Sequence, residues 1–409
     1  MTFDRKNTLS SRLSVVDHAT RAATAPDDPL RQLLTTLIQE TLTQEFAQFV
    51  GAAPHERSAT RTGWRNGHRR RRFTTRVGTL ELRVPRDRAG QFQPSLFARY
   101  QRHEQAFVAA LVEMYVQGVS TRKVTHVVEQ LCGAHVSASE VSALVKKLDA
   151  ELAAWRSRSL AGQAYPYLVF DAHVEQVRRE GHVRATAMLW VIGIRADGYR
   201  EHLGCWLGAS ESGESWTMVL EDLVRRGLTG VVYAVADEHQ GLVAALRRFF
   251  PDAAHQRCQV HYLRNALSKV SSMTHQQKLV AALKDIWSAP TRQDADGRLA
   301  RLIAMLRKPL PSVAEWLEET ASATLGVFEL PTAELRRRLR STNSIEHDHS
   351  EMRRRTRVIR IFPNEASLLR LGTALAIERN EQWLERRYFA PFTPEVQLAR
   401  GRFRARRIA

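Results

Sequence analysis

Residues 165–260 place strand-like and helix-like patterns in an order that few folds accommodate. The predicted segments are, in order, the strands Tyr167–Ala172, Thr186–Ile194 and Glu201–Gly208, a helix over 213–227, the strand Val231–Asp237, the helix Leu242–Phe250 and the strand Ala254–Val260. Antiparallel strands need only turns between them, whereas parallel neighbours need crossover helices. The order therefore predicts an α/β domain with a mixed five-stranded sheet, in which three antiparallel strands precede the parallel ones.

Two of these predicted strands end in an aspartate, Asp171 and Asp237. The strand order is that of the ribonuclease H-like fold, in which the first and fourth strands are neighbours. Two adjacent carboxylates at the ends of apolar strands are costly unless a cation binds them. Oxygen ligands without a Cys and His cage suit Mg²⁺ or Mn²⁺, so the pattern predicts a two-metal site for phosphodiester chemistry. The plainer interpretation is that each Asp is a cap or a surface residue.

Glu346 is the predicted third carboxylate of this site. It lies near the start of a predicted helix that Ser341 or Thr342 can cap. A row of arginines occupies the far end of this helix: Arg353, Arg354, Arg355 and Arg357. The competing acids are Asp348, Glu351, Glu238 and Glu214. Glu238 directly follows Asp237 and should point elsewhere, and Glu351 lies on another helical face than Glu346.

Cys258 and His261 have a spacing that is found in zinc sites, but the sequence offers no second pair nearby. Structural zinc needs four ligands, so zinc is the less favoured interpretation. The favoured one is a packed element near the carboxylates, with His261 close to DNA or to the scissile phosphate.

The net charge of +18 and the isoelectric point near 10.5 predict a polyanionic partner, most simply nucleic acid. A GC-rich genome would explain Arg in place of Lys, but not the clustering of the arginines. The three cysteines are far apart, which argues against a disulfide framework and favours a reducing cytoplasm. No secretory signal and no apolar run long enough to span a membrane is recognisable, so an intracellular protein is expected.

The first 160 residues predict a DNA-binding region. Residues 57–76 contain eight arginines and no acid, interleaved with Trp64 and Phe73, and this composition suits phosphate contact and base stacking. The predicted contacts are Arg65, Arg69, Arg70, Arg71 and Arg72. A hairpin is predicted over Thr74–Arg86, where apolar and polar residues alternate around a glycine. The alternative is a merely solvated charged surface.

Three short helices are predicted over 104–155, with the second capped by Ser120 and the third starting near Ser137 and continuing through Leu152. Gly-bearing turns after the first two favour a helix-turn-helix, whose third helix would present Lys146 and Lys147 to DNA. A three-helix bundle that does not bind DNA is the alternative. A further amphipathic helix from Pro29 to Val50 packs either internally or against a second copy of the chain, and the few apolar residues nearby favour the second copy.

The predicted division of the chain follows from these patterns. It comprises a disordered segment 1–28, an N-terminal helix, arginine-rich segment and hairpin over 29–100, a helix-turn-helix domain 101–160, a first core part 161–261, an all-helical insertion 262–335, final core helices 336–390 and a basic tail 391–409.

Over most of its length, from about Arg65 to Trp383, the chain resembles the Mutator-type family of bacterial insertion-sequence transposases, which belong to the DDE class. The resemblance depends on several segments in this order: Tyr167-Leu-Val-Phe-Asp171-Ala, Gly208-Ala-Ser-Glu-Ser-Gly-Glu-Ser-Trp216, Val235-Ala-Asp237-Glu-His-Gln-Gly241-Leu, Gln256-Arg-Cys258-Gln-Val-His261-Tyr-Leu-Arg-Asn265, Ser341-Thr-Asn-Ser-Ile-Glu346, Arg354-Arg-Thr-Arg357 and Phe362-Pro. The sequence departs from the usual family pattern at Glu238 and at His347-Asp-His349.

The resemblance implies a catalytic triad and a substrate. The triad falls on Asp171, Asp237 and Glu346, and the Cys-x-x-His signature falls on Cys258 and His261. It implies two Mg²⁺ ions, cleavage at terminal inverted repeats of double-stranded DNA, strand transfer to target DNA, and a homodimer in the bacterial cytoplasm, associated with the nucleoid. Arg264 and the arginines that follow Glu346 are expected to lie along the phosphates. The alternatives are a transposase-derived regulator that binds DNA without cutting it, and a structure-specific ribonuclease H-like nuclease.

Overall fold

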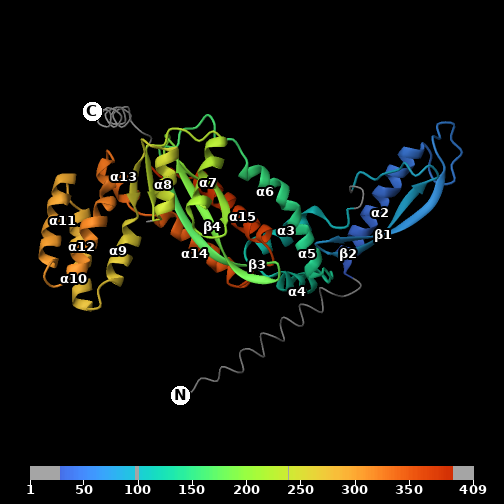
Figure 1. The fold of residues 1–409 in the computed structure, drawn as a ribbon. Coiled ribbons are helices and arrows are strands. Elements are labelled where there is room, and N and C mark those ends of the chain that lie inside the picture. The colour runs from blue at the N-terminus through green and yellow to red at the C-terminus, as the bar shows by residue number, and fades with distance from the viewer. Residues whose placement is uncertain (1–27, 97–100, 238, 390–409) are drawn as a thin grey trace, which may run out of the picture. The chain divides into compact units, whose positions relative to one another are not determined.

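A computed structural model of the chain describes residues 28–96, 101–237 and 239–389 (Figure 1). The predictions for the disordered segment before Asp28 and for the basic tail after residue 390 lie outside these residues. The chain divides into two compact units, Met1–Leu148 and Asp149–Ala409. None of the helices in the described ranges is long and apolar enough to cross a membrane.

The first unit begins with the predicted helix, α2, which runs Pro29–Val50. Asp28 caps it by accepting a hydrogen bond from the Leu30 amide, and Gly51 ends it in the left-handed conformation, with φ 70°. The C-terminal half of α2 packs internally, since Leu42 and Phe46 are buried and Leu42 joins the apolar face of the adjacent hairpin. Of the two alternatives, this half therefore follows internal packing and not the favoured contact with a second copy.

The hairpin consists of β1 (Arg65–Thr75) and β2 (Gly78–Asp87), paired antiparallel. The prediction that it begins at Thr74 was wrong, because the arginine-rich segment itself forms β1. Arg69–Arg72 pair with 81–84 of β2, whose apolar side chains lie beneath α2. Cross-strand pairing over that buried face extends the strand through residues whose own pattern is dominated by charge.

Three short helices complete the first unit. They are α3 (Gln105–Val116), α4 (Thr121–Cys132) and α5 (Ala138–Val145), and they share one apolar core. Ser120 caps α4 and Ser137 caps α5, as predicted, with Glu140 completing a capping box at Ser137.

The third predicted helix was too long. It stops at Val145 and is followed by a 3₁₀ turn, Lys146–Leu148, and by α6, Asp149–Arg156. The break has a physical cause, since α6 packs within the second unit. Leu152 is buried and Asp149 forms an ion pair of 2.7 Å with Arg370.

The second unit is built on the predicted five-stranded mixed sheet, in the order β5-β4-β3-β6-β7. The strands are β3 (Tyr167–Arg179), β4 (His182–Ile194), β5 (Arg200–Gly208), β6 (Tyr233–Ala236) and β7 (Ala254–Arg257). β3, β4 and β5 pair antiparallel, whereas β6 pairs parallel with both β3 and β7. The first and fourth strands are neighbours, which confirms the predicted order.

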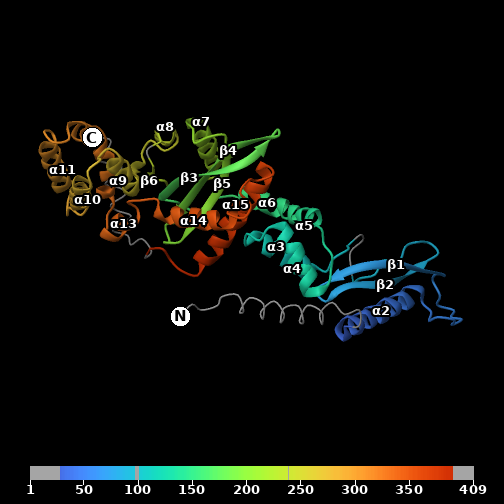
Figure 2. The same ribbon diagram turned by 90° about the horizontal axis from the view of Figure 1, so that it is seen from below.

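Helices cover both faces of this sheet (Figure 2). On one face, α7 (Gly213–Arg225) and α8 (Gln240–Phe249) pack on side chains such as Leu168 and Phe170. On the other, α14 (Asn343–Thr356) and α15 (Glu365–Leu384) pack on side chains such as Tyr167 and Val169. Successive residues of a strand point to opposite faces, so this alternation fixes which face every β3 residue serves.

β3 does not end at Asp171, contrary to the prediction. It continues to Arg179, because β4 pairs with it along its whole length. Its pairing with β6, however, covers only Tyr167–Val169. Asp171 therefore lies just beyond the point at which β6 stops pairing with β3, and it remains close to the end of β6.

An all-helical segment separates β7 from α14, as predicted. Its helices are α9 (Gln259–Ser268), α10 (Met273–Trp287), α11 (Arg292–Leu306), α12 (Pro311–Thr320), the 3₁₀ segment Ala321–Glu329 and α13 (Ala333–Arg338). They enclose an apolar core of their own, which includes Tyr262, Leu283 and Leu317.

Candidate active site

Asp171 and Asp237 lie on neighbouring strands, close to the end of β6. Asp171 belongs to the β3 face on which α14 and α15 pack, because it alternates with Tyr167 and Val169. Asp237 directly follows the last residue of β6. Asp171 is 8% exposed, whereas the Asp237 side chain is 39% exposed. One carboxylate is thus built into the sheet and the other lies at its rim.

Backbone and thiol contacts attach the start of α14, and with it Glu346, to the end of β6. The Cys258 amide donates to the Ala236 carbonyl at 2.7 Å, which places the start of α9 beside Asp237. The Cys258 sulfur accepts from the Thr342 amide at 3.4 Å and from its hydroxyl at 3.6 Å. Thr342 is the N-cap residue of α14. Contrary to the prediction, its side chain does not cap the helix and instead binds Cys258. The buried thiol therefore positions the helix that carries Glu346.

His261 lies between the two more exposed carboxylates. Its Nδ1 is 3.8 Å from Asp237 Oδ2, and its Nε2 is 3.5 Å from Glu346 Oε1. The adjacent Cys258 side chain, helped by Asp237 and Asp171, raises the pKa of His261 to about 9 against the opposing effect of burial. The imidazole is consequently a cation near neutral pH. The favoured interpretation of Cys258 and His261, a packed element near the carboxylates, agrees with these contacts.

The same interaction changes the thiol. Burial would raise the pKa of Cys258, but its contacts with His261 and with the Thr342 amide outweigh burial and lower the pKa. All three cysteines of the chain are buried and unpaired.

Burial raises the pKa of Asp171 to about 7, with smaller contributions in the same direction from Glu346 and Glu211 and opposing contributions from His261 and the Ala172 amide. His349 on α14 brings Nδ1 within 3.6 Å of Asp171 Oδ2. Burial lowers the pKa of His349 to about 3, so this ring is neutral and does not compensate the carboxylate. Among the described residues, the cationic His261 offsets only part of the effect of burial on Asp171.

The acids that competed with Glu346 have other partners or positions. Asp348 is fully buried and binds His202 at 2.9 Å and Arg379 at 2.6 Å. These two partners outweigh burial and lower the pKa of Asp348, as expected of a structural ion pair. Glu351 pairs with the arginines that follow it, Glu214 is exposed on α7, and Glu238 lies outside the described residues.

Glu211 is an acid near the site that sequence reasoning missed. It lies in the loop between β5 and α7, and burial raises its pKa, partly opposed by His239 and reinforced by Asp237. The electrostatic influence of Asp237 and His261 on Glu211 indicates that this loop approaches the carboxylates. The only sequence signal was its presence within the segment Gly208–Trp216, which carries part of the family resemblance.

The side chains suit a hard divalent cation in kind but do not form a finished cage. Carboxylate oxygens are the ligands that Mg²⁺ and Mn²⁺ prefer, and the raised pKa of Asp171 reflects an uncompensated buried carboxylate. Within the described ranges, however, no three Asp, Glu, His or Cys side chains are arranged to hold a metal ion. The positive charge that lies between Asp237 and Glu346 is that of His261.

The arginines and lysines predicted to contact DNA differ in their availability. In the first unit, Arg69, Arg70, Arg72, Lys146 and Lys147 are exposed. The other two predicted residues make hydrogen bonds within the protein. Arg65 donates to the Ala52 carbonyl, and Arg71 donates to the Gln101 carbonyl.

In the second unit, Arg264 was also predicted to contact DNA, and its guanidinium is exposed and lies 3.9 Å from Glu346. On α14, Arg353 and Arg357 are exposed, whereas Arg354 pairs with Glu351. Arg355 is 2% exposed and pairs with both Glu351 and Glu378. Its charge is already neutralised inside the protein, so we leave it out of the groups proposed below to contact DNA.

Comparison with known proteins gives one consistent result. A family model described as "Transposase, Mutator family" matches residues 5–386. The chain is 46% identical over 361 residues to the transposase for insertion sequence element ISRM5 of Rhizobium meliloti, covering 88% of this chain and 89% of the relative. It is 41% identical over 369 residues to the transposase for IS406 of Burkholderia multivorans, covering 90% and 94%. It is 39% identical over 364 residues to the transposase for IS256 in transposon Tn4001 of Staphylococcus aureus, covering 88% and 92%.

Proposed function

Because the chain belongs to the Mutator family of transposases, we propose that it binds the terminal inverted repeats of an insertion sequence and catalyses metal-dependent strand cleavage and strand transfer. The observation that supports the chemistry best is the approach of Asp171, Asp237 and Glu346 to His261 from three separate segments of the chain. The strand order and the acids at neighbouring strands also suit a ribonuclease H-like core of the DDE class.

The proposed roles follow from the chemistry of the side chains. Asp171, Asp237 and Glu346 would hold two Mg²⁺ ions, or Mn²⁺ in their place, which when bound activate a water or a 3′-hydroxyl and stabilise the leaving oxygen of a phosphodiester. Arg264, exposed beside Glu346, is placed to bind the neighbouring phosphate. His261, as a cation, offsets the negative charge of the carboxylates until the substrate and its metal ions are bound.

The first unit is proposed to recognise DNA. In the helix-turn-helix hypothesis, α5 enters the major groove, with Lys146 and Lys147 at its C-terminal end near the phosphates. The exposed arginines of β1 add phosphate contacts that do not depend on sequence. Both assignments are supported by exposure and charge, which are the properties that phosphate contacts need.

A homodimer is proposed as the acting form. The N-terminal half of α2 exposes Leu30, Leu33 and Leu37, at 63%, 67% and 58% of their surface. Three large apolar side chains at helical spacing form a stripe that a second α2 would cover. The similar insertion-sequence transposases come from bacteria, so we propose that the dimer acts in a bacterial cytoplasm on nucleoid DNA.

The direct test uses the DNA that flanks this reading frame. The protein is incubated with its imperfect inverted repeats in Mg²⁺, in Ca²⁺ and in EDTA, beside a shuffled end of equal length. We expect free 3′-hydroxyl ends in Mg²⁺ only, and only on the true ends. Asp171→Asn should bind the ends with unchanged affinity and cut none of them.

Other results would favour the two alternatives. Specific binding of the ends without any cleavage by the wild type would make the protein a DNA-binding regulator. Cleavage that follows junction shape and ignores the end sequence would make it a structure-specific nuclease. Cleavage in Ca²⁺ alone would contradict the two-metal account.

A further inference from the structure

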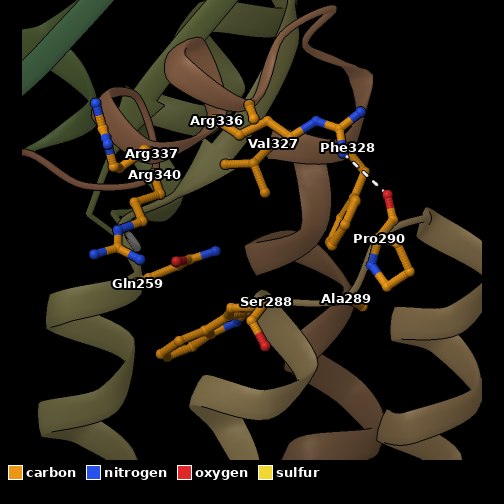
Figure 3. A pocket seen from close by; sticks show the side chains of 11 residues that line it. Gln259, Ser288, Ala289, Pro290, Val327, Phe328, Arg336, Arg337 and Arg340 are labelled. Carbon is orange, nitrogen blue, oxygen red and sulfur yellow. Dashed lines mark hydrogen bonds between the residues drawn. The ribbon is translucent and has the colours of Figure 1, made fainter.

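A pocket of about 340 Å³ lies between the helical insertion and the segment that leads to α14 (Figure 3). Its walls include the aromatic rings of Trp287 and Phe328, and Arg336, Arg337 and Arg340 line it. Figure 3 shows Arg340 beside Gln259, with Phe328 across the pocket from them. The size is at the lower end of the range, about 300–1,000 Å³, that is usual for small-ligand sites.

One polar atom in this pocket is buried without a partner. Gln259 is 3% exposed, and its Nε2 donates to the Thr324 carbonyl at 3.0 Å, which fixes the orientation of the amide. Its Oε1 has no hydrogen-bond donor among the described residues. A buried acceptor of this kind costs free energy unless a ligand or a water donates to it. The pocket thus contains a fixed acceptor that an N–H group would satisfy.

The charges at the pocket are also available. Arg336 is engaged, since it donates to the carbonyls of Leu330 and Pro290. Arg337 and Arg340 are exposed and have neither a hydrogen-bond nor an ion-pair partner in the described part of the chain. Two free guanidinium groups beside aromatic walls and a buried acceptor match a nucleotide, whose phosphate, flat base and N–H edge need these three features.

The pocket adjoins the carboxylates through shared segments. The backbone amide of Gln259 donates to the Arg340 carbonyl at 3.0 Å. The two segments that form the pocket are therefore the same two that bring Cys258 to Thr342. Gln259 and His261 are two residues apart on α9, so they project about 200° apart around its axis. The start of α9 therefore has the pocket on one side and the carboxylates on the other.

We propose that this pocket holds one unpaired nucleotide of the DNA end, with its base between Phe328 and Trp287, an N–H of the base on Gln259 Oε1, and an adjacent phosphate on Arg337 and Arg340. The inference rests on the proposed function, because the nucleotide belongs to the strand that reaches Glu346 and His261. Extruding a nucleotide costs unstacking and unpairing energy, which the pocket contacts offset. The bound nucleotide would hold the DNA end in register while the neighbouring phosphodiester bond is cut.

The test is photocrosslinking with the element's own end. A duplex carries 5-iododeoxyuridine at one position near the scissile phosphate, and the position is moved in a series of otherwise equal duplexes. This base crosslinks to aromatic side chains on which it stacks, and the crosslinked peptide is identified by mass spectrometry. We expect crosslinks to Phe328 or Trp287 from one or two adjacent positions only.

Variants decide whether the pocket chemistry is responsible. Gln259→Met keeps the size of the side chain and removes its acceptor together with the hydrogen bond from Nε2 to the Thr324 carbonyl. Arg337→Gln/Arg340→Gln removes two exposed charges without touching the core. Each should lower the crosslink yield about tenfold. Arg301→Gln is the matched control, because Arg301 is an exposed, unpaired arginine of the same insertion outside this pocket, among the described residues.

The outcomes separate this inference from the proposed function. Cleavage of the ends without any crosslink to Phe328 or Trp287, or with crosslinks unchanged in the Gln259 and arginine variants, overturns the pocket assignment alone. Crosslinks at one position without cleavage by the wild type support the pocket and overturn the catalytic proposal. Asp171→Asn should crosslink as the wild type does.

Discussion

At the scale of single residues, the burial of the Asp171 carboxylate lowers the stability of the folded protein. Its pKa of about 7 lies well above the ordinary value of 3.8, mainly because of burial. Between these two pH values the folded protein holds a proton that the unfolded chain releases, so stability falls as the pH rises from about 4 to about 7. Above pH 7 the ionised carboxylate remains a full destabilising term until a cation binds it.

Asp171→Asn should therefore stabilise the metal-free protein. At about pH 8 the upper limit of the gain is about 4 kcal/mol, less the hydrogen bond between Asp171 and the Ala172 amide. Differential scanning fluorimetry in EDTA should show a Tm several degrees above that of the wild type at pH 8, and a smaller difference at pH 5. Equal or lower Tm values for the variant at pH 8 would show that the burial of Asp171 is not the destabilising feature inferred.

Asp171 and Asp237 could be predicted because each follows a run of apolar residues, and such a run can be recognised in a single sequence without an alignment. Glu211 and His349 could not, because their approach to the site depends on the path of a loop and on the rotation of α14. Asp348 shows the opposite case. Its position in the sequence made it a candidate for the third ligand, but its carboxylate pairs with His202 of β5 and Arg379 of α15. Only the packed fold brings these residues together.

At the scale of elements, the helix that carries Glu346 is positioned by a thiol. The Cys258 sulfur accepts hydrogen bonds from both the amide and the hydroxyl of Thr342 at the start of α14. The backbone amide of Cys258 donates to the Ala236 carbonyl at the end of β6. The same sulfur is the leading cause of the raised pKa of His261. The Cys-x-x-His spacing thus joins three elements of the site.

Cys258→Ala should lower the cleavage rate more than it lowers stability. Loss of the acceptor costs about 1 kcal/mol of stability per hydrogen bond, whereas Glu346 loses its fixed position and the pKa of His261 falls. Cys205→Ala is the control, since Cys205 is equally buried in the same unit. Cleavage rates, DNA affinities and Tm values are compared for the two variants. A similar loss of cleavage in both, or none in Cys258→Ala, would contradict a positioning role.

Most elements followed from hydrophobic periodicity, and the exceptions have a common origin. β1 was missed because its arginines hide the alternation that its partner β2 imposes. The polar end of β3, Glu175–Arg179, was missed because only pairing with β4 makes it a strand. Local pattern predicts an element when its own side chains supply the core, and it fails when a distant partner does.

The exposed arginines of β1 should set the salt dependence of DNA binding. Replacing Arg69, Arg70 and Arg72 by Gln removes up to three phosphate contacts and should lower the slope of log affinity against log salt by up to about 0.9 for each. The charge-matched control replaces Arg292, Arg298 and Arg307, which are already paired with acids. Fluorescence anisotropy over a salt series measures both. Equal slopes for the wild type and the β1 variant would exclude β1 from the interface.

At the scale of the whole molecule, the chain combines a basic first unit with a second unit that carries the carboxylates. The division into Met1–Leu148 and Asp149–Ala409 separates the exposed arginines of β1 from the acids of the sheet. This is the arrangement expected of an enzyme that recognises DNA with one part and cuts it with another. A dimer would bring two of each to the two ends of an element.

The apolar stripe of α2 should control the oligomeric state. Leu33→Glu/Leu37→Glu places charges in the proposed interface and should reduce the mass measured by light scattering from that of a dimer to that of a monomer. Leu131→Glu is the control, because Leu131 is 71% exposed on another helix. An unchanged mass in the α2 variant would move the interface elsewhere.

Counting bound metal ions tests the central claim most directly. Mn²⁺ is titrated into the complex with the element end and followed by electron paramagnetic resonance, for the wild type, Asp237→Asn, Glu346→Gln and Glu351→Gln. The account predicts about two ions per chain for the wild type and for Glu351→Gln, whose carboxylate belongs to an arginine pair. It predicts the loss of at least one ion in each of the other variants. Equal Mn²⁺ binding in all four proteins, or none in the wild type, would contradict a metal site formed by Asp171, Asp237 and Glu346.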